Sequence, residues 1–330
     1  MLLTEPKTET TTRCSYCGQR NGEPVIRLGD PYLSRPDTFE MLACRRCGLV
    51  RTKQLPADLP RWYEEHYSKA QRIFQGCRRK AKGSRTYQVL DGLGVTRVVR
   101  KLNVNHHRFV ASQMPAAGKI LEVGCGAGEI LRLLKAKGTD VYGIEPHPDS
   151  AEAAGQHGIR ILADRLEALG DFDATFDTIL FSFSLEHTED PVAMLTQARA
   201  LLAPHGKLFV FTHNFDCFSR FVFGRNWSGW HLPYHTYLFT ADTLRMMLAK
   251  AGYRTERVRS YTRPDLLVES FRLALARWRG AKTAAFARKG HLISVLMCSA
   301  FTKPFGFLGL GNSIRAVATP EPPYSPGPAR

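Results

Sequence analysis

The stretch Lys119-Ile-Leu-Glu-Val-Gly-Cys-Gly-Ala-Gly-Glu-Ile-Leu131 decides the fold of this 330-residue chain. Its first apolar residues predict a short buried strand, and three glycines at alternate positions (Gly124, Gly126 and Gly128) predict a tight turn before a helix. Glycine is needed in such a turn because a side chain would keep the backbone away from a ligand at the helix N-terminus. The pattern therefore predicts a nucleotide-binding strand–turn–helix unit.

A carboxylate follows at the distance that nucleotide-binding units require. The next apolar run, from Val141 to Ile144, ends in Glu145, about 20 residues beyond the glycines, where an acid meets ribose hydroxyls in such units. A second acid, Glu122, lies within the first strand, before the glycines. The alternative is an ordinary glycine turn that only packs a helix on a strand.

The acid before the glycines also carries a family resemblance. The pattern Glu122-x-Gly124-x-Gly126-x-Gly128 resembles motif I of the class I S-adenosylmethionine-dependent methyltransferases, and Glu145 resembles their ribose-binding acid. The later segment Leu185-Glu-His187-x-x-Asp190-Pro191 resembles the loop after the fourth strand in small-molecule members of that family. The resemblance implies an enzyme that binds S-adenosylmethionine and transfers its methyl group.

The resemblance further implies which residues contact the cofactor. They are residues of motif I, acids that follow strands and serines of the fourth-strand loop: Glu122, Gly124, Cys125, Gly126, Gly128, Glu145, Asp164, Ser182 and Ser184. Asp164 follows the third strand, where related enzymes often bind the adenine amino group with an acid. The alternative for Asp164 is N-capping of a short helix that starts at Arg165.

Histidines are the candidates for acid–base chemistry. His187 is expected within reach of the methyl acceptor, where it could take a proton from a hydroxyl or amine. Its alternative role is a hydrogen bond that shapes the loop. The aromatic-rich segment 215–237 places His231 and His235 at the carboxyl edge of the sheet, where open α/β folds bind substrates. His235 is the second candidate base, and packing among the aromatics is the favoured role of His231.

Strand and helix patterns alternate through the core. Strands are expected near 119–123, 140–145, 159–162, 176–182 and 206–212, helices near 128–137, 148–157, 191–203 and 240–251, and a turn at 203–206. The segments 254–261 and 313–318 read as a sixth and a last strand. This alternation predicts an α/β fold with a Rossmann-like, doubly wound, mainly parallel seven-stranded sheet, preceded by a small zinc-ribbon domain.

The zinc ribbon is predicted from two matched Cys-x-x-Cys-Gly knuckles. Cys14 and Cys17, with Cys44 and Cys47, can place four thiolates tetrahedrally around a structural zinc ion. A thioredoxin-like redox pair is the alternative, which the second copy and the missing βαβ pattern disfavour. A ribbon before this core, together with Pro233-x-His235-x-x-x-Phe239-Thr240, resembles a bacterial methyltransferase subgroup often found in glycan or lipid-linked saccharide pathways.

These patterns divide the chain into segments. Residues 1–13 are expected to be disordered, 14–56 to form the ribbon, 57–114 a basic helical connector, 115–263 with 312–319 the methyltransferase core, 264–311 a basic amphipathic insertion and 320–330 a tail. A cationic amphipathic insertion suits an anionic membrane surface. Helices that cover the sheet, or a dimer contact, remain open as alternatives, and the oligomeric state is not indicated.

The net charge of +16 lies on the flanks of the chain. Residues 1–112 carry +11, residues 113–260 carry −2 and residues 261–330 carry +7. Basic flanks indicate an anionic partner, either a small-molecule or lipid-linked acceptor, a membrane surface or nucleic acid, unless they are only a solvated surface. With no signal peptide and no apolar run near the roughly 20 residues of a membrane span, we expect a cytoplasmic protein with peripheral contact at the inner face of the membrane.

The leading hypothesis is methyl transfer to an oxygen or nitrogen of a small-molecule, saccharide or lipid-linked acceptor, helped mainly by positioning. A ribosomal RNA (guanine) methyltransferase is the first alternative, because zinc ribbons and basic flanks occur in such enzymes. The sequence lacks the N/D-P-P-Y/F motif of adenine enzymes and the Pro-Cys pair of cytosine enzymes, so nucleic acid is the less favoured partner. A non-catalytic, zinc-dependent interaction module is the second alternative, which the intact glycine loop disfavours.

Overall fold

The computed structural model describes residues 13–20, 22–30, 37–57, 59–63, 92, 106–169, 175–278, 305–306 and 308–321. The chain forms two compact units, each assembled from separate stretches of sequence. The first unit comprises Met1–His106, His213–Thr240 and Ser260–Ser313, and the second comprises His107–Thr212, Ala241–Arg259 and Ile314–Arg330. The disorder predicted for 1–13 falls almost wholly outside the described residues, as do most of the connector and tail.

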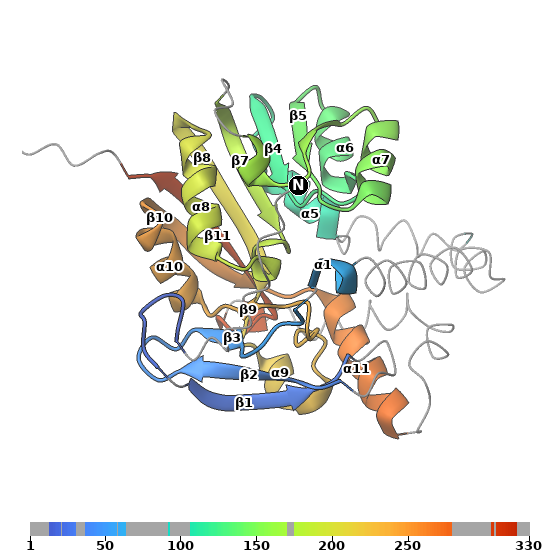
Figure 1. Ribbon diagram of the computed structural model, residues 1–330. Coiled ribbons are helices and arrows are strands. Elements are labelled where there is room, and N and C mark those ends of the chain that lie inside the picture. Colours follow the sequence, from blue (N-terminus) through green and yellow to red (C-terminus); the bar gives the residue numbers. More distant parts are fainter. Residues whose placement is uncertain are drawn as a thin grey trace, which may run out of the picture. The chain divides into compact units, whose positions relative to one another are not determined.

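A seven-stranded sheet has the order β10-β11-β8-β7-β4-β5-β6 (Figure 1). Its strands are β4 (Lys119–Val123), β5 (Asp140–Ile144), β6 (Arg160–Ala163), β7 (Phe176–Ser182), β8 (Leu202–His213), β10 (Tyr253–Tyr261) and β11 (Ser313–Pro320). The pairs β4–β5, β4–β7, β5–β6 and β7–β8 are all parallel. The predicted Rossmann-like, mainly parallel seven-stranded sheet is confirmed.

The order of this sheet creates a place for a ligand. From β4 the chain builds outward through β5 and β6, then returns to add β7 and β8 on the other side of β4. Ligands of open α/β sheets bind at such a reversal, outside the carboxyl ends of the strands. Ile120 and Leu121 of β4 and Ile179 of β7 are fully buried, as expected for central parallel strands that are covered on both faces.

Helices connect the strands of the second unit. They are α5 (His106–Gln113), α6 (Glu129–Lys135), α7 (Pro148–Gln156), η2 (Leu166–Leu169), η3 (Leu185–His187), α8 (Pro191–Ala200) and α10 (Ala241–Lys250). In Figure 1, α6 and α7 lie beside β5, and α8 lies across the β7–β8 part of the sheet. The start of α8 is fixed by its sequence, because Asp190 accepts backbone hydrogen bonds from Val192 and Ala193 (both 3.0 Å) and Pro191 occupies the first turn.

Two predicted boundaries are wrong. The turn expected at 203–206 belongs to β8, in which Leu202 pairs with Phe176 and Lys207 pairs with Thr178. Four residues of β8 therefore face one residue of β7, and the turn sequence is absorbed as an irregularity within the strand. The short helix after β6 begins at Leu166, one residue later than expected.

The first unit contains a separate antiparallel sheet of order β1-β2-β3-β9. Its strands are β1 (Gly22–Leu28), β2 (Phe39–Cys44), β3 (Val50–Thr52) and β9 (Tyr237–Leu238). The fourth strand comes from the aromatic-rich segment, and it pairs Leu238 with Val50 and Tyr237 with Arg51. Within the described residues of this unit, the helices are α1 (Leu59–Trp62), α9 (Phe218–Phe223), η4 (Gly224–Asn226) and α11 (Pro264–Trp278).

Candidate functional site

The glycine loop follows β4, at the point where the strand order reverses. All three predicted glycines adopt left-handed backbone angles, with φ of 75° at Gly124, 56° at Gly126 and 74° at Gly128. A Cβ on Gly124 would lie 2.7 Å from Cβ of Ser184, and one on Gly128 would lie 3.1 Å from Ile159. A Cβ on Gly126 would meet no atom within 4 Å. Two glycines are thus needed for packing, whereas Gly126 borders open space that a ligand can enter.

Glu145 locks this loop in place. Its Oε2 accepts a hydrogen bond from the backbone N–H of Gly126 (2.7 Å), and its Oε1 accepts one from the N–H of His147 (2.9 Å). Burial raises the pKa of Glu145, and these two N–H groups partly offset that effect. Each carboxylate oxygen has a second lone pair, so the acid can hold the loop and still accept hydrogen bonds from a diol.

Glu122 is buried in the sheet below the loop. Only 2% of the residue is exposed, and its Oε2 has no hydrogen-bond partner. Burial, followed by the charges of Glu129 and Glu145, raises the pKa of Glu122 well above its ordinary value. The carboxyl is therefore held in its neutral, protonated form. It is not exposed at the surface, where it could contact a ligand directly.

Cys125 lies in the loop, but its side chain points into the fold. Only 6% of the residue is exposed, and a Cβ on Gly143 of β5 would come within 2.6 Å of its Sγ. Burial is the main cause that raises the pKa of this thiol. The side chain thus packs against β5, and any cofactor contact of this residue must come from its backbone.

The loop after β7 lies against the glycine loop. The Ser184 hydroxyl donates a hydrogen bond to the carbonyl of Val123 (2.6 Å), the last residue of β4. Phe183 has a positive φ of 57°, a strained conformation for a residue with a side chain, and such strain clusters at functional sites. Ser182 is half-buried at the end of β7. The structure thus brings the predicted serines of this loop to the carboxyl ends of β4 and β7.

His187 ends the short helix η3 in this loop. Its side chain is half-buried, and its backbone N–H donates to the carbonyl of Ser184 (3.1 Å). The neighbouring Glu186 is fully buried and accepts a hydrogen bond from the Thr212 hydroxyl (2.9 Å), which fixes the loop to β8. This Glu186–Thr212 pair was not predicted; the polar residues that end the apolar run of β8 were the available signal.

Asp164 follows β6 directly and is exposed. Since η2 begins at Leu166, Asp164 does not occupy the capping position that was its alternative role. Its side chain makes no hydrogen bond to any residue that the structure describes. The predicted contact with an adenine amino group remains a prediction.

Three histidines gather in the first unit. The ring of His235 lies 4.7 Å from that of His213 and 5.0 Å from that of His231, measured between centroids. His213, at the end of β8, also contacts Trp227 edge-on at 6.4 Å. His213 was not predicted as a site residue, although a polar residue at the carboxyl end of a buried strand was a usable signal.

The tautomer of His235 is set by its surroundings. Its Nδ1 lies 2.8 Å from the carbonyl oxygen of Gly229, which can only accept, so Nδ1 carries the proton. The neutral ring then has its basic lone pair on Nε2. His235 is 2% exposed, and His231 has a positive φ of 33°.

The ribbon sheet holds the segment that carries His235. The Thr52 hydroxyl donates to the carbonyl of His235 (2.8 Å), and the Thr52 N–H donates to the carbonyl of Thr236 (2.9 Å). The Tyr237 hydroxyl donates to Ser15 Oγ (3.0 Å), inside the first cysteine knuckle. The ribbon and this histidine segment therefore form one hydrogen-bonded assembly.

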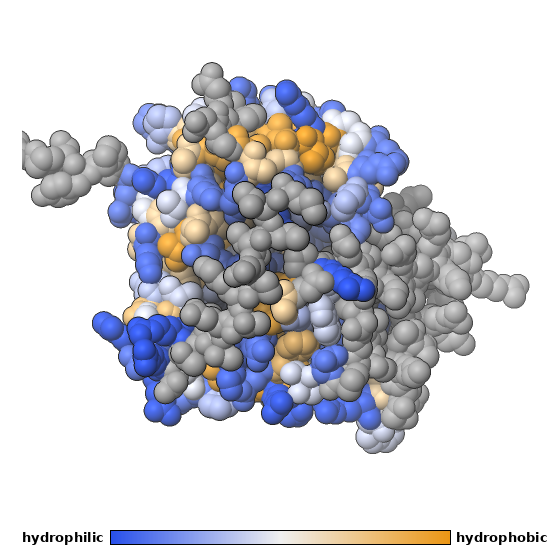
Figure 2. Space-filling model, in the orientation of Figure 1, coloured by the Kyte–Doolittle hydropathy of each residue, from blue (hydrophilic) through white to orange (hydrophobic). Residues whose placement is uncertain are grey.

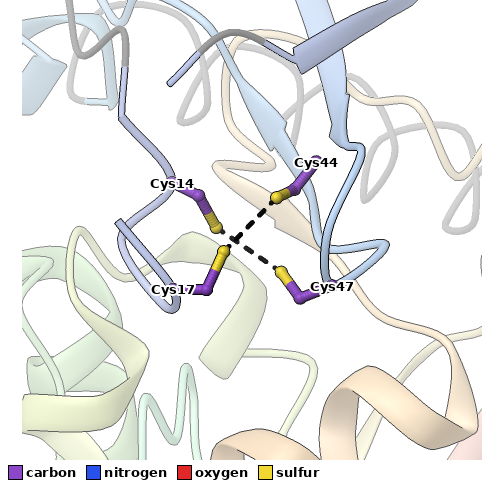
Figure 3. Close-up of side chains that lie close together, drawn as sticks. All are labelled: Cys14, Cys17, Cys44 and Cys47. Carbon is purple, nitrogen blue, oxygen red and sulfur yellow. Dashed lines mark hydrogen bonds between the residues drawn. The ribbon is translucent and has the colours of Figure 1, made fainter. Parts of the chain in front are cut away.

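The four predicted metal ligands lie together (Figure 3). Sγ of Cys14 is 3.6 Å from that of Cys47, and Sγ of Cys17 is 3.5 Å from that of Cys44. A disulfide would need about 2.05 Å, whereas thiolates about 2.3 Å from one tetrahedral zinc ion lie about 3.8 Å apart. The donor set and its spacing therefore fit zinc.

Both knuckles have the same backbone geometry. Gly18 donates its N–H to the carbonyl of Cys14 and Gly48 donates to that of Cys44, each at 2.9 Å, and both glycines have a φ near 70°. Burial raises the pKa of the Cys47 thiol, as do its cysteine neighbours, so four thiolates would repel one another without a cation.

The doubly wound sheet, the glycine loop at the reversal of strand order and the acid after the next strand are features of the Rossmann-like methyltransferase fold. Residues 96–258 match the sequence model of a family described as "Methyltransferase domain". This stretch of the chain is a methyltransferase domain.

Curated relatives match the same region. A ubiquinone biosynthesis O-methyltransferase from Xylella fastidiosa is 33% identical over 132 residues, which cover 38% of this chain and 54% of that protein. One from Xanthomonas euvesicatoria pv. vesicatoria is 31% identical over 132 residues, covering 38% and 55%. The chain thus spans about half the length of the curated relatives it matches.

Solved structures of methyltransferases also resemble the chain. A possible histamine N-methyltransferase from Thermotoga maritima has a TM-score of 0.43 and 20% identity, covering 68% of this chain and 95% of its own. Magnesium protoporphyrin IX methyltransferase from Synechocystis PCC 6803, solved with bound S-adenosylhomocysteine, has a TM-score of 0.46 and 13% identity, covering 80% and 98%.

Proposed function

We propose that this protein transfers the methyl group of S-adenosylmethionine to an oxygen atom of a small-molecule, saccharide or lipid-linked acceptor. The arrangement of Glu145 and the glycine loop carries the proposal, because a clamped carboxylate beside open space at Gly126 suits a ribose. The two relatives named O-methyltransferase support oxygen over nitrogen as the methylated atom.

The residues of the second unit would hold the donor in three places. Glu145 would accept hydrogen bonds from the ribose hydroxyls, and exposed Asp164 would accept one from the adenine amino group. The backbone of the glycine loop would lie against the methionine part, with Ser182 and Ser184 beside it. When bound, S-adenosylmethionine supplies a methyl group on a positively charged sulfur, so positioning is the main task of the protein.

A hydroxyl acceptor must lose its proton, and two histidines are candidates to take it. His187 lies on the loop after β7, at the carboxyl edge where substrates of α/β folds bind. His235, in the first unit, has a fixed tautomer with its lone pair on Nε2. Loss of a base that acts during transfer changes the pH profile of turnover, whereas loss of a residue that only shapes a loop lowers turnover without moving that profile.

The four cysteines would bind a structural zinc ion. The two knuckles present their thiols at spacings close to those of a tetrahedral site, and the metal would take no part in methyl transfer. A hydrogen bond from the Tyr237 hydroxyl links the first knuckle to β9, so the metal would help to hold the His235 segment.

Isothermal titration with S-adenosylmethionine tests the donor site. Glu145→Gln keeps the shape of the side chain but removes its charge, and we expect affinity to fall about tenfold or more. The matched control is Glu152→Gln, which alters an exposed acid on α7 and should leave affinity unchanged. Equal affinities of the wild type and Glu145→Gln would refute this placement of the donor.

Methyl transfer from labelled donor to fractions of a cell extract tests the acceptor. We expect label in the small-molecule, saccharide or lipid fraction, and His187→Gln should lower turnover while donor affinity is kept. Label in ribosomal RNA alone would contradict the proposed acceptor class, while donor binding without label in any fraction would favour a non-catalytic role.

A further inference from the structure

Among the described residues, the large apolar side chains that are exposed all belong to the first unit. They are Phe221, Val222, Phe271, Trp278, Leu308 and Leu310, and we call them the apolar face. Phe221 and Val222 are 68% exposed, and Trp278 is 80% exposed. The second unit contributes none within the described residues, so the exposed apolar side chains are confined to particular elements of the first unit.

The apolar face is continuous between α9 and the segment that precedes β11. Phe218 of α9 stacks on Phe305 at 4.0 Å between ring centroids, and its N–H donates to the carbonyl of Leu310 (3.1 Å). Phe221 and Val222 follow Phe218 by three and four residues, so they lie on the same side of the helix. The exposed side chains of α9 therefore continue into the segment of Leu308 and Leu310.

Helix α11 adds a second apolar stripe. Its inner side is fixed by Ser270, which is fully buried, accepts the Ser228 N–H (2.9 Å) and donates to the carbonyl of Leu266 (2.9 Å). Phe271 and Trp278 are seven residues apart, which places them on one face of the helix. α11 also packs against α9, so both exposed sets belong to one helical layer.

Cations accompany the apolar face. The Arg220 guanidinium lies 4.3 Å from the centroid of the Phe221 ring, and exposed Arg277 precedes Trp278. The sequence that follows, 279–303, has five Lys or Arg residues and no Asp or Glu; its structure lies outside the described residues. By contrast, the visible surface over β1 and β2 is mainly hydrophilic (Figure 2).

We propose that the apolar face is a docking surface for an anionic lipid bilayer. Aromatic and aliphatic side chains would enter the boundary between headgroups and acyl chains, and the neighbouring cations would meet lipid phosphates. None of the helices in the described part of the chain has the length and apolar character needed to cross a bilayer, so contact would be interfacial. The segment 279–303 carries basic residues and no acids. This favours a uniformly anionic surface over a protein partner with charges of both signs.

Flotation of the full-length protein with vesicles tests this surface. We expect binding to vesicles of phosphatidylcholine with phosphatidylglycerol, little binding to phosphatidylcholine alone, and a blue shift of the emission of exposed Trp278. The double variant Phe221→Ser, Trp278→Ser should weaken partitioning at least about tenfold, since two aromatic side chains no longer leave water.

A pair of arginine variants separates this face from general basic charge. Arg277→Ala should weaken binding to anionic vesicles about fivefold. Arg45→Ala, at an exposed arginine directly after β2, should change binding less than twofold. Equal loss in both variants would overturn the assignment to the apolar face.

Other outcomes also overturn the proposal. No flotation of the wild type with anionic vesicles would do so, as would unchanged flotation of the double variant. Self-association of the wild type that the double variant lacks, without vesicle binding, would make the face a contact between copies of this chain. Calorimetry with S-adenosylmethionine should give the wild-type affinity in the double variant, so this inference fails or stands independently of the proposed function.

Discussion

The wild-type protein should lose stability as pH rises because of the buried carboxyl of Glu122, and Glu122→Gln should remove that loss. The folded protein holds Glu122 neutral, with a pKa well above its ordinary value, because the group is buried and lies near Glu129 and Glu145. In the unfolded chain the same carboxyl ionises near pH 4.3. Glutamine has nearly the same shape and cannot ionise, so the substitution removes the titration with little change in packing.

The sign and size follow from proton binding. Below the unfolded pKa, Glu122 is protonated in both states, so its titration does not change the free energy of unfolding. Between that value and the folded pKa, the folded state binds the extra proton, so rising pH lowers the free energy of unfolding by about 1.4 kcal/mol per pH unit. The free energy of unfolding of Glu122→Gln, relative to that of the wild type, should therefore increase by about 1.4 kcal/mol per pH unit. It should level off above the pKa of Glu122 in the folded state.

Urea unfolding at successive pH values measures this difference. Circular dichroism is the suitable signal, because the four tryptophans, Trp62, Trp227, Trp230 and Trp278, all lie in the first unit and Glu122 lies in the second. Glu152→Gln, at an exposed acid, is the matched control and should run parallel to the wild type. Parallel curves for Glu122→Gln and wild type would refute the assignment of a neutral Glu122.

Three further substitutions test other parts of the structure. Gly126→Arg should abolish S-adenosylmethionine binding in calorimetry while zinc content is kept. Because Gly126 has left-handed backbone angles, the substitution should also cost about 1–2 kcal/mol of stability. Retained affinity would contradict the placement of the site. Thr212→Val removes the hydroxyl that donates to buried Glu186 and should lower the free energy of unfolding by about 1–3 kcal/mol. Thr212→Ser keeps the hydroxyl and should not. Equal stabilities of the two variants would argue against the Glu186–Thr212 hydrogen bond. Cys44→Ser should eliminate bound zinc in metal analysis and increase hydrogen exchange in β9, and unchanged exchange there would show that the metal does not support the histidine segment.

The sheet and its glycine loop were predictable because local pattern and burial agree there. Ile120, Leu121 and Ile179 lie in short apolar runs, and such runs between turn residues specify buried parallel strands. Glu145 was predictable from its distance to the glycines. The backbone N–H groups that bind its carboxylate were not, because they depend on how the loop folds back on β5.

Side-chain direction was the harder problem. Cys125 is in the predicted loop, yet its thiol packs beneath Gly143, since a glycine in β5 leaves space for it. His213 stands at the carboxyl end of a buried strand, which was a usable signal, but its contact with the His235 ring depends on the tertiary fold and could not be seen in the local pattern. Pairing of β9 with β3 was missed because two residues are too few to show the period of a strand.

The short strand β9 has a consequence for how the protein is made. Tyr237 and Leu238 complete a sheet whose other strands end at Thr52, so the ribosome must synthesise nearly all of the methyltransferase domain before the ribbon can close. Pairings between such distant residues form late, because the intervening chain must first be brought together. A fragment that ends after the cysteine knuckles would present β3 as an unpaired edge, which invites association with other chains. The cysteine module is thus translated first, but its sheet cannot be completed until Leu238 has been synthesised.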